Sequence, residues 1–85
     1  EILSAIDPLK DVDAFHPINV GLIAEGSPRF LPCTPAGVVE MLVRSGIPIR
    51  GAEVVIVGRS NLVGRPLSIM LSQKGDRADA TVTLC

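Results

Sequence analysis

The stretch AEVVIVGRSNLVGRP, residues 52–66, decides the fold. It begins with a short, nearly continuous apolar run that ends at Gly58, a pattern typical of a buried parallel strand. A polar turn with a second glycine, Gly64, follows, and a helix is expected over residues 62–73. The next strand is expected at ATVTLC, residues 80–85. Strand, turn, helix and strand together predict an α/β fold with a right-handed βαβ crossover.

The turn between the first strand and the helix has the features of a phosphate-binding site. Free backbone N–H groups at the start of a helix meet the positive end of the helix dipole and attract anions. Gly58 lets the chain leave the strand sharply, and Gly64 permits a close approach of helix and strand or of backbone and ligand. Ser60 and Asn61 can cap the helix or reach a phosphate. The spacing is G-R-S-x-x-x-G and not G-x-G-x-x-G, so an ordinary strand–helix turn stays an open alternative.

Arg59 bears on which nucleotide such a turn would bind. Folds that prefer NAD place an Asp or Glu about 20 residues after the first glycine, at the end of the second strand. Asp76 and Asp79 precede the second strand here, so the deciding position lies at or beyond Cys85. Arg59 is instead a cation beside the turn that can bind the 2′-phosphate of NADP. The alternative is a solvated surface arginine.

A further helix is expected immediately before the βαβ unit. Thr34 is a suitable N-cap and Pro35 a suitable first helical residue. The Val, Leu and Met side chains of residues 38–43 recur at helical spacing, which predicts that they belong to the core. Gly46 is a suitable C-cap.

The first part of the chain has weaker patterns. Residues 1–7 have the apolar spacing of the end of an amphipathic helix. Residues 9–21 predict an extended run that Pro17 and Gly21 break. Residues 22–34 contain Pro28 and Pro32 and end just before Pro35; each proline lacks a backbone donor, and the stretch predicts an irregular loop.

Composition narrows the class of protein. The 85 residues are 47% hydrophobic but only 2% aromatic, which predicts an aliphatic core in one domain or in pieces of two. The net charge of −1 gives no reason to expect a nucleic-acid partner, and no apolar run reaches the roughly 20 residues of a membrane span. Cys33 and Cys85 lack the spacing of a metal site, and we expect two free thiols in a reducing cytosol, packed as small buried hydrophobes. The chain does not begin with Met and ends in a strand-like run, so an internal piece of a longer protein is expected.

Four segments together resemble one family. The segments are KDVDAFHPINVG (10–21), PCTPAGVVEML (32–42), GRSNLVGRP (58–66) and ATVTLC (80–85). In their order and spacing, they resemble the bifunctional methylenetetrahydrofolate dehydrogenase/cyclohydrolases. The resemblance implies a cytoplasmic homodimer that uses NADP and a folate substrate. It oxidises 5,10-methylenetetrahydrofolate to 5,10-methenyltetrahydrofolate and then hydrolyses this product to 10-formyltetrahydrofolate. The two alternatives are a non-catalytic nucleotide-binding α/β module and a relative with dehydrogenase activity alone.

The resemblance also implies a division of the chain. Residues 1–34 would be the C-terminal part of a folate-binding catalytic α/β domain, residues 35–50 a connecting helix, and residues 51–85 the start of a Rossmann-type NADP-binding domain. The polar connection GDRAD, residues 75–79, is longer than in many relatives and resembles a surface insertion.

The resemblance assigns roles to four residues. The second aspartate of K-D-V-D, here Asp13, would hold the pterin ring, because a carboxylate can accept paired N–H donors. Gly58, Arg59 and Ser60 would contact the phosphate and ribose of NADP. The alternative for Asp13 is a turn cap.

Other positions near Asp13 are expected to have no catalytic role. Asp11 is expected to be structural, and His16 to be a hydrogen-bonded loop residue. The family has Gly where this chain has Ala14, and a positive φ there would strain an alanine. The catalytic lysine of the family, in Tyr-x-x-x-Lys, would precede Glu1, and Lys10 is not its equivalent. No catalytic residue and no metal site are therefore assigned within the chain.

Overall fold

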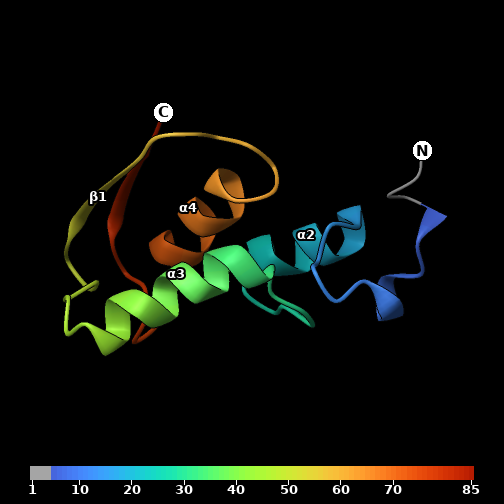
Figure 1. Cartoon of the computed structure of the whole chain (residues 1–85), viewed down its shortest axis with the longest axis horizontal. Helices are drawn as coiled ribbons and strands as arrows, with labels where there is room; N and C mark the ends of the chain where they lie inside the picture. Colours follow the sequence, from blue (N-terminus) through green and yellow to red (C-terminus); the bar gives the residue numbers. More distant parts are fainter. Residues whose placement is uncertain (1–4) are drawn as a thin grey trace.

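The computed structural model describes residues 5–85, with two strands and four helical elements. In chain order these are η1 (Pro8–Lys10), α2 (Pro17–Glu25), α3 (Cys33–Arg44), β1 (Glu53–Ile56), α4 (Gly64–Ser72) and β2 (Thr81–Leu84). The strands lie at one end of an elongated molecule and α2 lies toward the other, with α4 between them (Figure 1). α3 runs below α4, from the strand end of the molecule toward α2. The helix end expected over residues 1–7 falls for the most part outside the described residues.

The βαβ unit is confirmed. β1 and β2 pair in parallel, in a register that joins Glu53 to Thr81 and Ile56 to Leu84. α4 connects the two strands and packs against β2. The expectation that β1 is buried on both faces is wrong for this chain. Exposed and half-buried residues alternate along the strand, and the outward-facing Val55 is 65% exposed.

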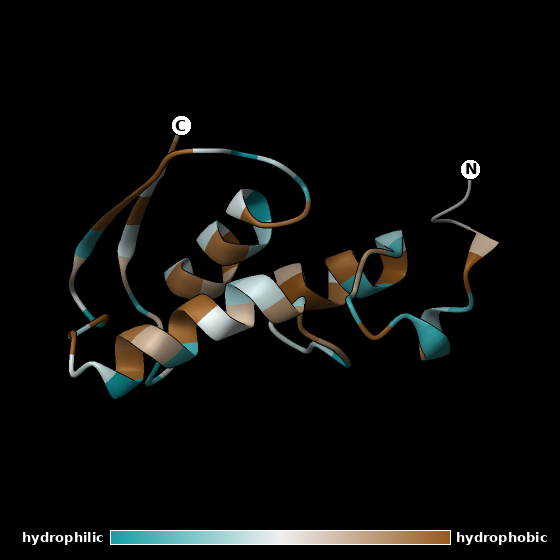
Figure 2. Cartoon of the chain, in the orientation of Figure 1, coloured by the Kyte–Doolittle hydropathy of each residue, from teal (hydrophilic) through white to brown (hydrophobic). Residues whose placement is uncertain are grey.

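A small aliphatic core lies between α3, α4 and the inner face of the sheet. Its buried residues are Val39, Ile49, Leu67 and Leu71, and the side chains packed around them include Val38, Leu42, Val54, Ile56 and Val82. Brown, apolar segments occur on α3, on α4 and on the strands in Figure 2. The prediction that all of residues 38–43 are core is wrong in part, because Met41 is 70% exposed and Val43 is also exposed.

The helix α3 begins earlier than expected. Its first residue is Cys33, with Pro32 at the N-cap position and no side-chain cap hydrogen bond, so Thr34 is not the cap. Pro35 is still in the first turn, where a missing N–H costs nothing. Gly46, at φ 72°, follows the last turn and ends the helix as expected. Cys33 and Cys85 are both free thiols, but they are exposed, so the expected burial is wrong.

The main correction concerns α2, which the sequence interpretation divided between an extended run and a loop. Pro17 is the first helical residue, where proline's fixed φ suits a helix. The Nδ1 atom of His16 accepts a 3.1 Å hydrogen bond from the N–H of Ile18 and caps the helix. The helix ends at Gly26, whose φ of 83° gives the left-handed conformation of a C-cap. His16 therefore has the hydrogen-bonded structural role expected of it.

Within residues 5–85, no helix combines the length and apolar character needed to cross a membrane. The same residues contain no cluster of His, Cys, Asp and Glu side chains with the arrangement of a metal site.

Candidate functional site

The turn after β1 has almost no space between the strand end and the start of α4. Gly58 has a φ of 111°, and its N–H donates a 2.9 Å hydrogen bond to the carbonyl oxygen of Cys85. A Cβ atom at Gly64 would overlap the carbonyl group of Gly58 and lie 3.0 Å from Cα of Arg59. Only glycine therefore fits at position 64, which is the close approach that the sequence pattern predicted.

Ser60 organises this turn. Its carbonyl oxygen accepts a 3.0 Å hydrogen bond from the N–H of Arg65, and its Oγ accepts a 3.3 Å hydrogen bond from the N–H of Val63. The N–H groups of Arg59, Asn61 and Leu62 donate to no acceptor among residues 5–85. Exposed N–H groups just before a helix are suited to an anion. This part of the structure therefore fits the phosphate groups of a dinucleotide.

Arg59 projects from this turn as an exposed side chain. No carboxylate among residues 5–85 lies within ion-pair distance of its guanidinium, whereas Arg44, Arg50 and Arg77 all have acidic partners. Its positive charge is thus available to an anionic ligand such as a 2′-phosphate. An arginine that contacts only solvent would have the same arrangement.

The loop before α2 carries the expected folate residue. Asp13 is exposed, and its carboxylate accepts no hydrogen bond from residues 5–85, so it does not have the role of a turn cap there. Asp11 is buried and accepts a 2.7 Å hydrogen bond from the N–H of His16, which is the structural role expected of it. Ala14 is buried with a φ of 59°, so an alanine occupies the left-handed conformation that glycine adopts more easily.

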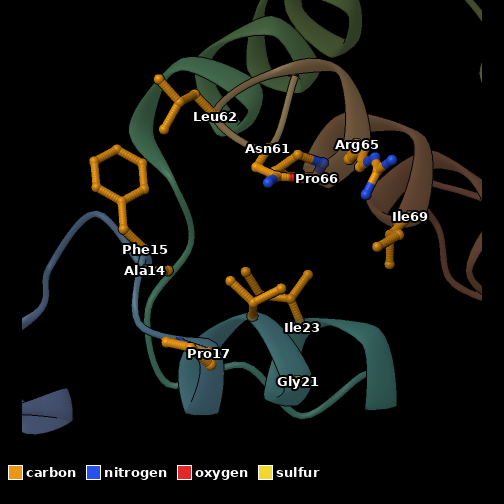
Figure 3. Close-up of a pocket in the computed structure, with 11 residues that line it drawn as sticks. Ala14, Phe15, Pro17, Gly21, Ile23, Asn61, Leu62, Arg65, Pro66 and Ile69 are labelled. Carbon is orange, nitrogen blue, oxygen red and sulfur yellow. The ribbon is translucent and has the colours of Figure 1, made fainter. Parts of the chain in front are cut away.

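A pocket of about 540 Å³ joins these two regions (Figure 3). One wall comes from the loop and α2, and the other from the turn and α4. The lining residues are Ala14, Phe15, Pro17, Val20, Gly21, Ile23, Asn61, Leu62, Arg65, Pro66 and Ile69. None of the four residues singled out from the sequence lines the pocket itself.

The pocket nevertheless lies next to the expected site residues. Ala14 follows Asp13 in the chain, and Asn61 follows Ser60. Arg65 stands next to the turn glycine, a place from which the sequence predicts that it either faces solvent or caps the cleft, and it lines the pocket. Phe15 is a lining residue that sequence reasoning missed, because an extended conformation was expected for its segment.

The amino-acid sequence is similar to that of known proteins over most of its length. Residues 32–85 match the family model described as tetrahydrofolate dehydrogenase/cyclohydrolase, NAD(P)-binding domain. The bifunctional protein FolD of Syntrophobacter fumaroxidans is 63% identical over 84 residues, which are 99% of this chain and 28% of that protein. The FolD protein of Halobacterium salinarum is 58% identical over 84 residues, again 99% of this chain and 28% of the relative.

Solved structures give the same result. A 5,10-methylenetetrahydrofolate dehydrogenase from the silkworm Bombyx mori superposes with a TM-score of 0.92 at 43% identity, over 99% of this chain and 31% of that one. The methylenetetrahydrofolate dehydrogenase-cyclohydrolase of Trypanosoma brucei, solved with NADP cofactor and inhibitor, has a TM-score of 0.84 at 42% identity, over 96% of this chain and 27% of that one. The structure has a βαβ unit with a glycine turn at residues 58–64, and residues 32–85 match the family model. The chain therefore belongs to the tetrahydrofolate dehydrogenase/cyclohydrolase family.

Proposed function

We propose that this chain contributes one wall of the active site of an NADP-dependent methylenetetrahydrofolate dehydrogenase that is also a methenyltetrahydrofolate cyclohydrolase. The chain spans 28–29% of the length of the curated relatives it matches, so the complete site needs further residues. One observation carries the proposal. A single pocket lies between the Ala14–Phe15 segment and the Asn61–Leu62 segment, which adjoin the residues expected to bind folate and cofactor.

On the folate side, Asp13 is the proposed ligand of the pterin ring. A carboxylate can accept two parallel N–H donors, such as the 2-amino group and the neighbouring ring N–H of a pterin. Asp13 is suited to this because it is exposed and its carboxylate accepts no hydrogen bond from residues 5–85. The apolar side chain of Phe15 then gives the bound ring a surface to pack on.

On the nucleotide side, Gly58, Arg59 and Ser60 are the proposed cofactor ligands. The exposed N–H groups of the turn would bind the phosphates, and Arg59 would bind the 2′-phosphate that distinguishes NADP from NAD. NADP, when bound, accepts the hydride from the methylene carbon of the folate. The contribution of these residues is to hold and orient the two reactants in one pocket.

The proposal also divides the chain into parts. Residues 1–34 would complete a folate-binding catalytic domain, residues 35–50 would connect the domains, and residues 51–85 would begin the NADP-binding domain. The assembly would be a cytoplasmic homodimer, as the family resemblance implies. Sedimentation of the full-length protein tests the homodimer.

Kinetics of the full-length protein test the activity. We expect NADPH to form when 5,10-methylenetetrahydrofolate and NADP are supplied, and 5,10-methenyltetrahydrofolate to be hydrolysed in a separate assay without cofactor. Oxidation without hydrolysis would instead favour a dehydrogenase alone. The relative from Bombyx mori, a 5,10-methylenetetrahydrofolate dehydrogenase, supports this second candidate. A protein with neither activity would contradict both candidates.

A further inference from the structure

Gln73 makes a hydrogen bond across the molecule that neither the sequence pattern nor the proposed function requires. It follows the last residue of α4, and its side-chain Nε2 donates to the carbonyl oxygen of Ile23 in the last turn of α2. Among residues 5–85, this is the one hydrogen bond that joins residues 5–32 to residues 46–85. A half-buried amide thus connects the two proposed domains.

This bond lies at one end of the pocket. Ile23 is itself a lining residue, and Ile69, one turn before Gln73 on α4, lines the opposite wall. The glycine turn and the Ala14–Phe15 loop lie at the other end (Figure 3). The bond from Gln73 therefore sets the separation of α2 and α4 where they close the pocket.

The main chain of Gln73 is linked in turn to the sheet. Its carbonyl oxygen accepts a 2.7 Å hydrogen bond from the N–H of Asp79, and the carbonyl oxygen of Asp79 accepts a 2.9 Å bond from the N–H of Gly51. Gly51 and Asp79 precede the two strands. A displacement of α2 is therefore opposed by the sheet that carries the glycine turn, and not by α4 alone.

We propose that Gln73 is a positioning residue for hydride transfer, which fixes the folate-binding loop relative to the cofactor-binding turn. The inference rests on the proposed function. Hydride transfer needs both reactants within roughly 3–3.5 Å, and a misplacement of about 1 Å can cost on the order of 100-fold in rate. Hydrolysis of the methenyl group needs only the folate side and water. A loss of this bond should therefore slow the dehydrogenase selectively.

The test uses Gln73→Met in the full-length enzyme, because methionine has a similar length but no donor. Losing one neutral hydrogen bond predicts that kcat of the dehydrogenase falls about tenfold. KM for NADP and the cyclohydrolase rate should change little, and the melting temperature should fall by a few degrees at most. Use of a deuterated methylene group should give a larger isotope effect on kcat than in the wild type, since hydride transfer becomes more nearly rate-limiting. The matched control is Lys74→Met, at the next position, whose exposed side chain makes no hydrogen bond with residues 5–85.

A second variant, Gln73→Glu, separates positioning from simple loss of structure. An ionised glutamate cannot donate to the carbonyl of Ile23, but a protonated one can. We therefore expect the ratio of dehydrogenase to cyclohydrolase to be low near neutral pH and to rise toward the wild-type ratio at acidic pH.

Equal losses of both activities, or an unchanged dehydrogenase in Gln73→Met, would overturn the role of Gln73 and leave the proposed function standing. A wild-type protein without either activity would overturn the proposed function, and the role of Gln73 with it.

Discussion

The side-chain amide of Asn19 donates a 3.0 Å hydrogen bond to Oδ2 of Asp11, and both residues are buried. The same Nδ2 also donates to the carbonyl oxygen of Pro8 at 2.9 Å. The N–H of His16 donates to Oδ2 of Asp11 as well. These bonds attach the loop that carries Asp13 to the first turns of α2, so the proposed folate ligand is held by a buried polar cluster.

Asp11 should make the stability of the protein depend on pH. Burial raises its pKa, but the hydrogen bonds from His16 and Asn19 outweigh that effect and hold the pKa below its ordinary value of 3.8. A carboxyl whose pKa is lowered by folding stabilises the folded state above its unfolded pKa, and this contribution is lost as the pH falls through the folded pKa. We therefore expect Asp11→Asn to lower the melting temperature at neutral pH, with a smaller loss at acidic pH. A constant difference from the wild type at all pH values would contradict this account.

Asp13→Asn should act on ligand binding and not on stability. The substitution replaces an acceptor by an amide that presents two donors, so one pterin N–H would face a donor at a cost of about 1–3 kcal/mol. We expect folate binding and both activities to weaken, with NADP affinity and the melting temperature almost unchanged. Glu25→Gln, an exposed carboxylate at the end of α2, is the control with the same change of charge. Normal folate kinetics in Asp13→Asn would remove Asp13 from the site.

Gly64→Ala should be one of the most damaging small substitutions in the chain. The new methyl group would overlap the carbonyl of Gly58, and displacing that backbone should cost about 3 kcal/mol or more. Gly37→Ala is the matched control, because that helical glycine has open space around its Cβ position. We expect Gly37→Ala to raise the stability by about 0.5–1 kcal/mol. Thermal unfolding of both variants checks the contrast, and equal effects would contradict the close approach at the turn.

Ala14→Gly should be nearly neutral, although it removes a buried methyl group. Losing that burial costs about 0.8 kcal/mol, and the freer unfolded glycine costs about 0.5–1 kcal/mol more. Relief of the left-handed conformation returns about 1–2 kcal/mol. Ala78→Gly, at a buried alanine without a positive φ, has the two costs and no relief. Denaturant unfolding should therefore show that Ala78→Gly is clearly the more destabilising of the two.

Arg59→Ala should change cofactor preference. A charge-assisted contact with the 2′-phosphate is worth roughly 1.5–3 kcal/mol, so NADP should bind about tenfold to a hundredfold more weakly. NAD lacks that phosphate and should bind as before, and the cyclohydrolase should keep its rate. Arg29→Ala, at another exposed arginine, controls for the loss of one positive charge. Steady-state kinetics with both cofactors at fixed ionic strength measure the effect. Equal losses for NAD and NADP would mean that Arg59 only maintains the turn.

The βαβ unit was predictable because its signals are local. The apolar run, the two glycines of the turn and the second strand each determine the conformation of a few neighbouring residues, and the structure places β1, α4 and β2 where these signals indicate. The exposure of Val55 was not predictable in the same way. Val55 and, just after the strand, Val57 are exposed apolar side chains, a pattern that indicates a covering layer that residues 5–85 do not supply.

The helix α2 was missed because its two apparent breakers have little effect where they stand. Pro17 needs no N–H at the first helical position, and Gly21 inside the helix costs only about 1 kcal/mol. The pocket could not be predicted from local sequence patterns for a different reason. Its two walls come from segments far apart in the chain, and only the packing of α2 on α4 brings them together.

The two ends of the sheet differ in their tolerance of length changes. At the carboxyl end, the bond between Gly58 and Cys85 fixes the strands beside the proposed cofactor turn. At the amino end, the bond between Gly51 and Asp79 fixes them independently, just after the exposed connection at residues 75–77. Insertions or deletions in that connection would therefore leave the positions of the strands unchanged. Over evolution, orthologues can therefore vary the length of this connection while the turn at the opposite end keeps its geometry.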